Sequence, residues 1–327
     1  MNKAIIFGGA GYIGTHLAIY LLEHKRFDKI IIADIEPIKN ELLKSSENVE
    51  YYFCDVRDEI PTKIGTEVDW IFNFAAIHRE PGHEHWEYFD TNLKGARNIS
   101  NFADEVDCNN IFFTSSIAVY GPTIDETPED TLKTPNSAYG SSKYAAELIQ
   151  EKWRVSKPGR RLIVVRPGVV YGPGDPGNIL RMIKAIQKGY FAYPGSTDIK
   201  KSYAYIYGLL ESMIFFMEKE VEQVKYNYVE YPTESLGSVT SIVKEELNSN
   251  APIFSLPMFL LKPASKIVYS ILGDKTPVHP RRVEKAAMPT NIIPKVLIKE
   301  DFDFQYDFRT SLRHWQEILP EDFGYKK

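Results

Sequence analysis

The stretch KAIIFGGAGYIGTHLAIYLLE, residues 3–23, decides the fold. It begins as a short apolar run, turns through a glycine-rich segment, and continues as an apolar helical pattern. Such glycines allow a tight turn, a close approach of the backbone to a bound group, and close packing of the helix on the strand. The amides at the helix N-terminus can then hold a phosphate. A tight turn without a ligand is the alternative, but the strand–turn–helix context favours a dinucleotide site at Gly8, Gly11 and Gly14.

Apolar runs continue to alternate with helical patterns through the first half of the chain. This alternation predicts an α/β fold, a Rossmann-type doubly wound parallel sheet. The runs are rich in β-branched and aromatic residues, as expected for strands buried on both faces. Strands are predicted at 3–8, 29–34, 49–54, 69–76, 110–116 and 162–167, and helices at 12–24, 84–107 and 138–155.

The character of the sequence changes after the sixth predicted strand. RPGVVYGPGDPGN, residues 166–178, is dense in Gly and Pro and predicts a loop. A helix near 178–188 and a Pro-interrupted tail follow, and a strand near 226–229 is expected to return to the sheet. We therefore predict an NAD-binding Rossmann domain over 1–170 with a returning segment near 202–247. Residues 171–201 and 248–327 are predicted to form a smaller, irregular C-terminal substrate-binding lobe.

The second strand ends in Asp34, about twenty residues past the last glycine. A carboxylate there accepts hydrogen bonds from the adenosine ribose and repels a 2′-phosphate. Ile35, Glu36 and Pro37 follow with no arginine, so the cofactor is predicted to be NAD rather than NADP. Asp55 after the third strand is placed to reach the adenine edge, or else is an ordinary turn residue. Ala75 and Ala76 leave room for the cofactor at the end of the fourth strand.

Composition narrows the class of protein. The chain has 327 residues, 43% of them hydrophobic, and a net charge of −5, which argues against a nucleic-acid binder. The two cysteines, Cys54 and Cys108, indicate buried thiols in a reducing compartment and no metal cluster. The N-terminus has no signal-peptide pattern, and no apolar run approaches the ~20 residues of a membrane span. Lysines and prolines interrupt residues 251–273, so a buried or interfacial segment is expected there, in a cytoplasmic protein.

SAYGSSKYAAEL, residues 137–148, places Tyr139 and Lys143 one helical turn apart, on one face. A tyrosine with a pKa of ~10 is a weak base at neutral pH. A nearby ammonium and the positive nicotinamide ring favour the phenolate. The fifth strand delivers Ser115 and Ser116 to the carboxyl edge of the sheet, where Ser116 can hydrogen-bond a substrate hydroxyl. Together with the glycine turn and Asp34, this makes a chance Tyr-Lys spacing a poor explanation.

Six motifs complete the pattern: GGAGYIG (8–14), NFAA (73–76), TNLKGARN (91–98), SSIAVYG (115–121), YGSSK (139–143) and RPGVVYGPGD (166–175). In this order they resemble the extended short-chain dehydrogenase/reductase family of nucleotide-sugar enzymes. The resemblance implies bound NAD, Tyr139 as acid/base, Lys143 on the nicotinamide ribose and Ser116 on the reacting hydroxyl. It implies a structural role for Asn92 and further cofactor contacts from Tyr12, Ile13, Val56, Phe74, Tyr139, Lys143 and Pro167.

One departure bears on the reaction. Family members that dehydrate or decarboxylate a sugar usually carry an acid just after the catalytic Ser/Thr, where this chain has Ile117 and Ala118. The pattern is therefore closer to 4-epimerases, and we predict an NAD-dependent 4-epimerase of a diphosphate-linked hexose or N-acetylhexosamine. An NAD(P)H-dependent reductase of a 4-keto nucleotide sugar is the alternative. A non-catalytic NAD sensor is the third class, which the intact Ser-Tyr-Lys set disfavours.

A looser resemblance covers the later part of the chain. AAIHRE, GNILRMIKAIQKG, KKSYAYI and HPRRVEKAAMPTNI look like a branch that contains polyprenyl-diphosphate N-acetylglucosamine epimerases and 4-keto reductases. Ordinary loop charges or polar loop groups are the alternative for these residues. A homodimer is expected, with peripheral membrane contact if the substrate is lipid-linked. The resemblance implies substrate contacts from His78, Glu80, Asn178, Lys201, Arg281 and Arg282.

Overall fold

The computed structural model describes residues 2–80, 82–175, 177–273 and 279–324. Seven parallel strands form the central sheet, in the order β11-β7-β5-β4-β1-β2-β3. The order reverses between β1 and β4, as in a doubly wound nucleotide-binding sheet. The strands are β1 (Lys3–Phe7), β2 (Lys29–Asp34), β3 (Val49–Phe53), β4 (Trp70–Asn73), β5 (Asn110–Thr114), β7 (Arg161–Pro167) and β11 (Gln223–Tyr228).

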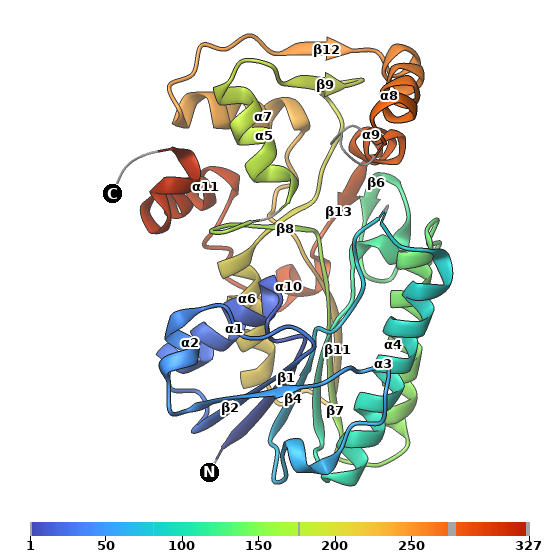
Figure 1. Cartoon of the computed structure of the whole chain (residues 1–327), viewed down its shortest axis with the longest axis vertical. Coiled ribbons are helices and arrows are strands. Elements are labelled where there is room, and N and C mark those ends of the chain that lie inside the picture. The colour runs from blue at the N-terminus through green and yellow to red at the C-terminus, as the bar shows by residue number, and fades with distance from the viewer. Residues whose placement is uncertain (1, 81, 176, 274–278, 325–327) are drawn as a thin grey trace.

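Helices cover both faces of this sheet (Figure 1). One face packs against α1 (Tyr12–Glu23) and α6 (Ile206–Glu218), which contribute Leu17 and Leu209 to the larger core. The other packs against α3 (His85–Glu105) and α4 (Ala138–Val155), which contribute Ile99 and Trp153 to a second core. The central strands are buried on both sides because of these two layers, and this explains their near-continuous apolar sequences.

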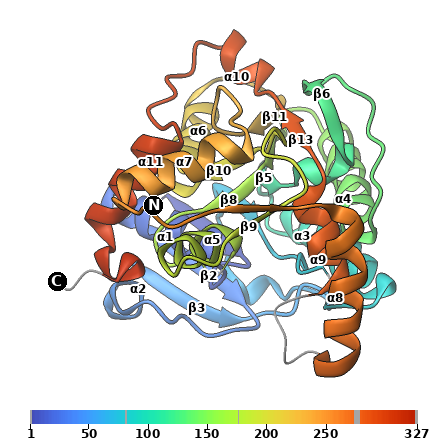
Figure 2. The ribbon, with the colours of Figure 1, turned by 90° about the horizontal axis from the view of Figure 1, so that it is seen from above.

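The remaining elements form a smaller layer beyond the carboxyl ends of the strands (Figures 1 and 2). Short parallel pairs join its segments: β8 with β10, β9 with β12, and β6 with β13. These elements are β6 (Thr123–Thr127), β8 (Val169–Tyr171), β9 (Ala192–Pro194), β10 (Tyr203–Tyr205), β12 (Phe254–Leu256), β13 (Thr290–Ile292), α5 (Asn178–Gln187), α7 (Leu236–Glu246), α8 (Met258–Leu272), α9 (Pro280–Ala287), α10 (Lys295–Lys299) and α11 (Phe308–Ile318). A short helix, α2 (Glu41–Ser45), and the 3-10 turns Thr62–Ile64, Ile117–Tyr120 and Pro320–Phe323 complete the described elements.

The predicted fold class is confirmed, and each predicted strand and helix of the sheet is present within a few residues. The returning strand is β11, which pairs with β7 from Gln223 to Tyr228. Cys54 and Cys108 are both free and buried, as expected. The division into two domains remains a prediction, and several packing contacts cross it. α10, from the C-terminal tail, packs on β11, whereas α7, from the returning segment, packs on α5 and α11.

The segment 251–273 was expected to be buried or interfacial, and it is not buried. Most of it forms α8, in which Ser265 is the one residue classed as buried. No described helix is long and apolar enough to cross a membrane.

Candidate functional site

The carboxyl ends of the central strands bring most of the predicted site residues to one edge of the sheet. β1 leads into Gly8, β4 into Ala75 and Ala76, and β5 into Ser115 and Ser116. This edge at the strand-order reversal is where open α/β sheets bind ligands. A candidate active site therefore lies between the sheet and the smaller lobe.

The glycine turn packs too closely for side chains at two of the three glycines that the sequence singled out. Gly8 has φ +77°, and a Cβ atom there would lie 2.6 Å from the backbone nitrogen of Ala75. A Cβ on Gly14 would lie 2.4 Å from the carbonyl oxygen of Gly8. At Gly11 the only close neighbour would be that same oxygen, at 3.2 Å, so this glycine leaves the start of α1 open. Since the first turn of α1 carries no acidic residue, the turn fits a cofactor pyrophosphate.

Asp34 is fixed by backbone donors on both of its oxygens. The amide of Ala10 donates to Oδ2 at 2.9 Å, and the amide of Glu36 donates to Oδ1 at 3.0 Å. The carboxylate is thereby tied to the glycine turn, where an adenosine ribose would lie if the pyrophosphate sits on α1. Asp34 as the ribose-binding residue remains a prediction, and this geometry supports it.

Asp55 forms an ion pair with a neighbouring arginine. Arg57 grips it, with Nε 3.0 Å from Oδ1 and Nη2 2.5 Å from Oδ2. These hydrogen bonds lower the pKa of Asp55. An adenine edge would have to bind beside this pair, so the adenine role stays a prediction. The next residue, Val56, is buried, and a Cβ on Gly95 of α3 would lie 2.8 Å from its side chain.

Tyr12, Ile13 and Phe74 turn their side chains into the protein. All three pack against the larger core, and the Phe74 ring lies 6.4 Å from the ring of Phe112. The Tyr12 hydroxyl is buried and has no hydrogen-bond partner among the described residues. Tyr12 and Ile13 can therefore serve a cofactor chiefly through backbone amides at the start of α1. Pro167 is buried at the end of β7, opposite Tyr228 of β11.

The three predicted catalytic side chains come from two neighbouring elements. Ser116 caps the 3-10 turn after β5, and Tyr139 and Lys143 lie one turn apart on α4. The Ser116 side chain lies near enough to the Tyr139 hydroxyl to lower its pKa. Lys143 is buried, with its Nζ 4.4 Å from the centroid of the Phe113 ring. The structure thus brings Ser116 close to Tyr139 and places Lys143 one turn further along the same helix.

Burial controls the ionisation of this group. It raises the pKa of Tyr139, an effect that the nearby Ser116 side chain opposes. It also lowers the pKa of Lys143 to about 7, while the negative charge of Glu147 acts in the other direction. In this state the phenolate is disfavoured, so a further positive charge is needed before Tyr139 can accept a proton near neutral pH. The nicotinamide ring of NAD is such a charge.

Asn92 ties the site together through three hydrogen bonds. Its side-chain amide donates to the Ile77 carbonyl at 3.2 Å and to the Ser142 hydroxyl at 2.8 Å, and its oxygen accepts from the Ile77 amide at 3.0 Å. The Ser142 hydroxyl in turn donates to the Tyr139 carbonyl at 2.8 Å. Asn92 therefore links the loop after β4 to the helix turn that carries Tyr139, as a structural role requires.

The sequence analysis missed a buried ion pair beneath Lys143. Arg166 of β7 donates to Glu147 of α4, with Nε 2.9 Å from Oε1 and Nη2 2.6 Å from Oε2. Glu147 also accepts from Ser115, and Arg166 donates to the Tyr120 hydroxyl at 2.8 Å. One signal was available, because Glu147 lies one turn beyond Lys143 on the same helix.

Four of the six predicted substrate residues lie on α9 or contact it: Glu80, Lys201, Arg281 and Arg282. Lys285 of α9 donates to Glu80 at 2.5 Å, and Lys201 donates to the Lys285 carbonyl at 2.9 Å and to the Met288 carbonyl. Burial lowers the pKa of Lys201 to about 8. Arg281 and Arg282 are exposed in the first turn of α9. Lys201 is therefore occupied by backbone carbonyls rather than free, and any diphosphate contact from it would compete with them.

Electrostatic effects connect this cluster to the catalytic group. The Tyr88 ring centroid lies 6.3 Å from that of Tyr139. Burial and then Glu80 raise the pKa of Tyr88, and the positive charge of Arg281 opposes them. His78 lies in the loop after β4. Burial lowers the pKa of its ring, and the positive charges of Arg79 and Lys143 lower that pKa further.

The sixth predicted substrate residue stands apart in its contacts. Asn178 is exposed at the first position of α5 and accepts a hydrogen bond from Arg181 of the same helix at 3.1 Å. Among the residues that the structure describes, no contact between Asn178 and the α9 cluster supports its predicted role beside the diphosphate.

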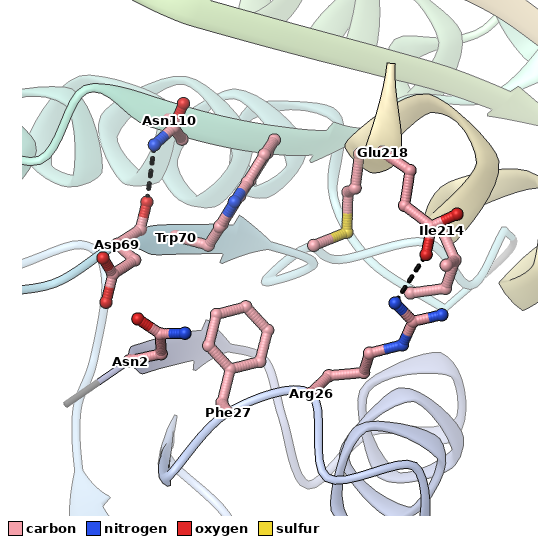
Figure 3. Close-up of a pocket in the computed structure, with 9 residues that line it drawn as sticks. Asn2, Arg26, Phe27, Asp69, Trp70, Asn110, Ile214 and Glu218 are labelled. Carbon is pink, nitrogen blue, oxygen red and sulfur yellow. Dashed lines mark hydrogen bonds and ion pairs between the residues drawn. The ribbon is translucent and has the colours of Figure 1, made fainter. Parts of the chain in front are cut away.

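A separate hollow of about 310 Å³ lies at the opposite, amino ends of the strands (Figure 3). Trp70 and Phe27 line it, and Arg26 and Glu218 pair across it at 2.5 Å. It lies away from every predicted site residue, so it does not contribute to the candidate active site. Within the described ranges, no group of three or more His, Cys, Asp or Glu residues could hold a metal ion.

Comparison with known proteins identifies the family. The NAD dependent epimerase/dehydratase family matches residues 4–229 of the chain. The chain belongs to this family. NAD is the cofactor of the family, and the glycine turn and Asp34 fit it.

Relatives of this epimerase/dehydratase chain include two kinds of sugar epimerase. It is 29% identical over 300 residues, 88% of this chain and 86% of the relative, to N-acetyl-alpha-D-glucosaminyl-diphospho-ditrans,octacis-undecaprenol 4-epimerase of Escherichia coli O157:H7. It is 28% identical over 192 residues, 54% of this chain and 55% of the relative, to a bifunctional UDP-glucose and UDP-xylose 4-epimerase of Pisum sativum.

Solved structures show the same fold. UDP-glucuronic acid 4-epimerase from Bacillus cereus, in complex with UDP-glucuronic acid and NAD, superposes with a TM-score of 0.76 at 17% identity. The match covers 98% of this chain and 99% of that one. The likeness therefore extends beyond the sheet into the smaller lobe.

Proposed function

We propose that the protein is an NAD-dependent 4-epimerase of a diphosphate-linked hexose or N-acetylhexosamine, acting through a transient 4-keto sugar. The observation that carries this proposal is the placement of Ser116, Tyr139 and buried Lys143 together at the edge of the sheet that also holds the glycine turn. This arrangement can move a proton at a substrate hydroxyl next to a bound nicotinamide.

Each member of the group has a separate task. The phenolic oxygen of Tyr139 takes the proton from the C4 hydroxyl and later returns it. The Ser116 hydroxyl hydrogen-bonds the reacting oxygen and orients it toward Tyr139. Lys143, when charged, favours the phenolate and can hold the nicotinamide ribose. When bound, NAD accepts a hydride from C4 and gives it back.

The residues after Ser116 favour epimerisation over loss of water. Ile117 is buried, and the Ala118 amide donates to the Ser116 hydroxyl at 3.2 Å, so the pair forms the start of a tight turn. Neither can donate a proton to a leaving hydroxyl. The carboxylate of Glu80, which raises the pKa of Tyr139, is held by Lys285 at 2.5 Å.

Substrate anchoring is proposed for the cations around α9. Arg281 and Arg282 are exposed and can grip a diphosphate, since guanidinium groups form paired hydrogen bonds with phosphate oxygens. An anchor on the diphosphate would leave the flat 4-keto sugar free to turn and receive hydride on its opposite face. His78 and Glu80 are proposed sugar contacts from the loop after β4.

The test uses a sugar donor labelled with deuterium at C4 and no added cofactor. An epimerase that retains NAD returns the label to carbon, so NMR should show a C4-inverted product that keeps deuterium. Mass spectrometry of the purified protein should show retained NAD. Product that appears only with added NAD(P)H, and that is reduced at C4, would establish the reductase alternative instead.

A homodimer is proposed through the outer faces of α3 and α4. These packed helices expose large apolar side chains, Trp86 and Phe89 from α3 and Leu148 and Val155 from α4. A second copy would bury them in a helical interface. Light scattering after size exclusion should give twice the chain mass, and Leu148→Glu should halve it. A monomeric wild-type protein would refute the proposal.

A further inference from the structure

α8 exposes an apolar face that nothing else in the described chain covers. Phe259 and Ile271 are each 75% exposed, Ile267 is 60% and Leu260 is 53%. Phe259, Ile267 and Ile271 are separated by multiples of four residues, with Pro263 between them, so they form one stripe along the helix. The opposite side, which contains buried Ser265, packs on α9. The apolar face is therefore the outward face, the reverse of a helix in a globular core.

The preceding strand extends this surface. β12 exposes Phe254 and Leu256, and it crosses the end of the smaller lobe beside β9 before it leads into α8 (Figures 1 and 2). A grouping of this kind on a protein surface marks an interaction site rather than a random scatter.

The charges around this surface have the sign that suits anionic lipid. Residues 251–273 contain two lysines, Lys262 and Lys266, and neither Asp nor Glu, although the whole chain carries a net charge of −5. Lys262 pairs with Glu284 of α9 at 2.7 Å, and Arg281 and Arg282 add positive charge in the first turn of α9. A helix with one apolar face and flanking lysines is typical of peptides that lie in the membrane interface.

We propose that α8 and β12 form a membrane-contact surface that lies in the interface of an anionic bilayer. α8 has 15 residues, which is too short to span a bilayer but long enough to lie along its surface. A second copy of the chain is a poorer occupant. A two-fold contact through this face would gather the lysines of both copies, Lys262 and Lys266 from each, in one interface, and residues 251–273 contain no Asp or Glu to pair with them.

The surface is joined to the candidate substrate residues by a single helix. α9 packs on α8, and its Lys285 pairs with Glu80 and offers its carbonyl to Lys201. A sugar diphosphate held at α9 could therefore keep a lipid carrier in the bilayer beneath α8. This last step rests on the proposed function, whereas the membrane-contact surface does not.

Vesicle flotation of the full chain tests the surface. Vesicles of phosphatidylcholine with about a third phosphatidylglycerol should carry the protein upward, and less so as salt is raised or when phosphatidylglycerol is omitted. Phe259→Ser with Ile267→Ser should lower the partition coefficient about tenfold or more, because both apolar groups would enter the interface. Ile124→Ser, which removes a 79% exposed isoleucine from β6, is the matched control and should float as wild type does.

Three outcomes would overturn the proposal. Wild-type protein could remain unbound, the double variant could float as well as wild type, or the double variant could halve the solution mass without any vesicle binding. The third outcome would assign the face to a second copy. Turnover of a UDP-sugar without vesicles separates this test from the proposed function. We expect the double variant to keep the wild-type rate, and a wild-type protein that floats but does not epimerise would refute only the proposed function.

Discussion

Removal of Arg166 should reveal how strongly the buried polar network supports the site. The Arg166 side chain is 2% exposed and the Glu147 side chain 0%. Arg166→Met leaves the Glu147 carboxylate buried with only Ser115 as a donor among the partners described above. Breaking a buried pair in this way typically costs about 3–5 kcal/mol of unfolding free energy.

A cycle of variants separates the charge from the packing. Arg166→Met combined with Glu147→Leu replaces both charges with apolar side chains of similar volume, an exchange that is often near neutral. The double variant should therefore be more stable than Arg166→Met alone. If the two substitutions acted independently, the double variant would instead be less stable than Arg166→Met.

The assay is thermal and urea unfolding of NAD-free protein, followed by tryptophan fluorescence and circular dichroism. A loss of about 3–5 kcal/mol corresponds to a fall in melting temperature on the order of 10 °C for a chain of this size. The reasoning is refuted if Arg166→Met stays within about 0.5 kcal/mol of wild type, or if the double variant is the least stable of the three.

Three further substitutions test the candidate site. Tyr139→Phe should lower turnover by ~10²–10⁴-fold while NAD still binds, and a variant that keeps a tenth of wild-type turnover would place proton transfer elsewhere. Wild-type protein should bind NAD far more tightly than NADP in a calorimetric titration, and Asp34→Ala should reduce this difference in affinity. Equal wild-type affinities for the two cofactors would contradict the assignment of Asp34. Burial lowers the pKa of Lys143 from 10.5 to about 7. The free energy of unfolding is therefore reduced most below pH 7, and this reduction becomes smaller as the pH rises toward 10.5. Lys143→Met should therefore raise the melting temperature of NAD-free protein most at or below pH 7, and a gap that stays constant up to pH 10 would contradict this account.

The local patterns were predictable because the signals that set them lie close together in the sequence. The steric need for glycine at Gly14 is local, because a Cβ there would meet the Gly8 carbonyl oxygen six residues earlier, whereas Gly8 itself packs on the distant Ala75. The buried strands were visible as apolar runs because both of their faces are covered. The Tyr139 and Lys143 spacing follows directly from helical geometry.

Contacts between distant segments were not predictable in the same way. Lys201 was predicted to contact the substrate diphosphate, which stays a prediction, but its hydrogen bonds to carbonyls of a segment more than eighty residues later were not predicted. The pairing of Arg57 with Asp55 was not predicted either, and the adenine contact of Asp55 stays a prediction. The pairing of Glu147 with Arg166 depends on which strand lies beneath α4, and sequence alone does not specify that.

The parallel sheet has a consequence for synthesis on the ribosome. β7 ends at Pro167, but its outer neighbour β11 begins only at Gln223. β6 likewise pairs with a strand that begins only at Thr290. A nascent chain that has reached Val170 therefore carries β7 as an open edge, with unpaired backbone groups along an apolar strand. Until the next sixty or so residues emerge, that edge can pair with other chains. The order of the strands thus makes the interval before β11 emerges the period of greatest aggregation risk during synthesis.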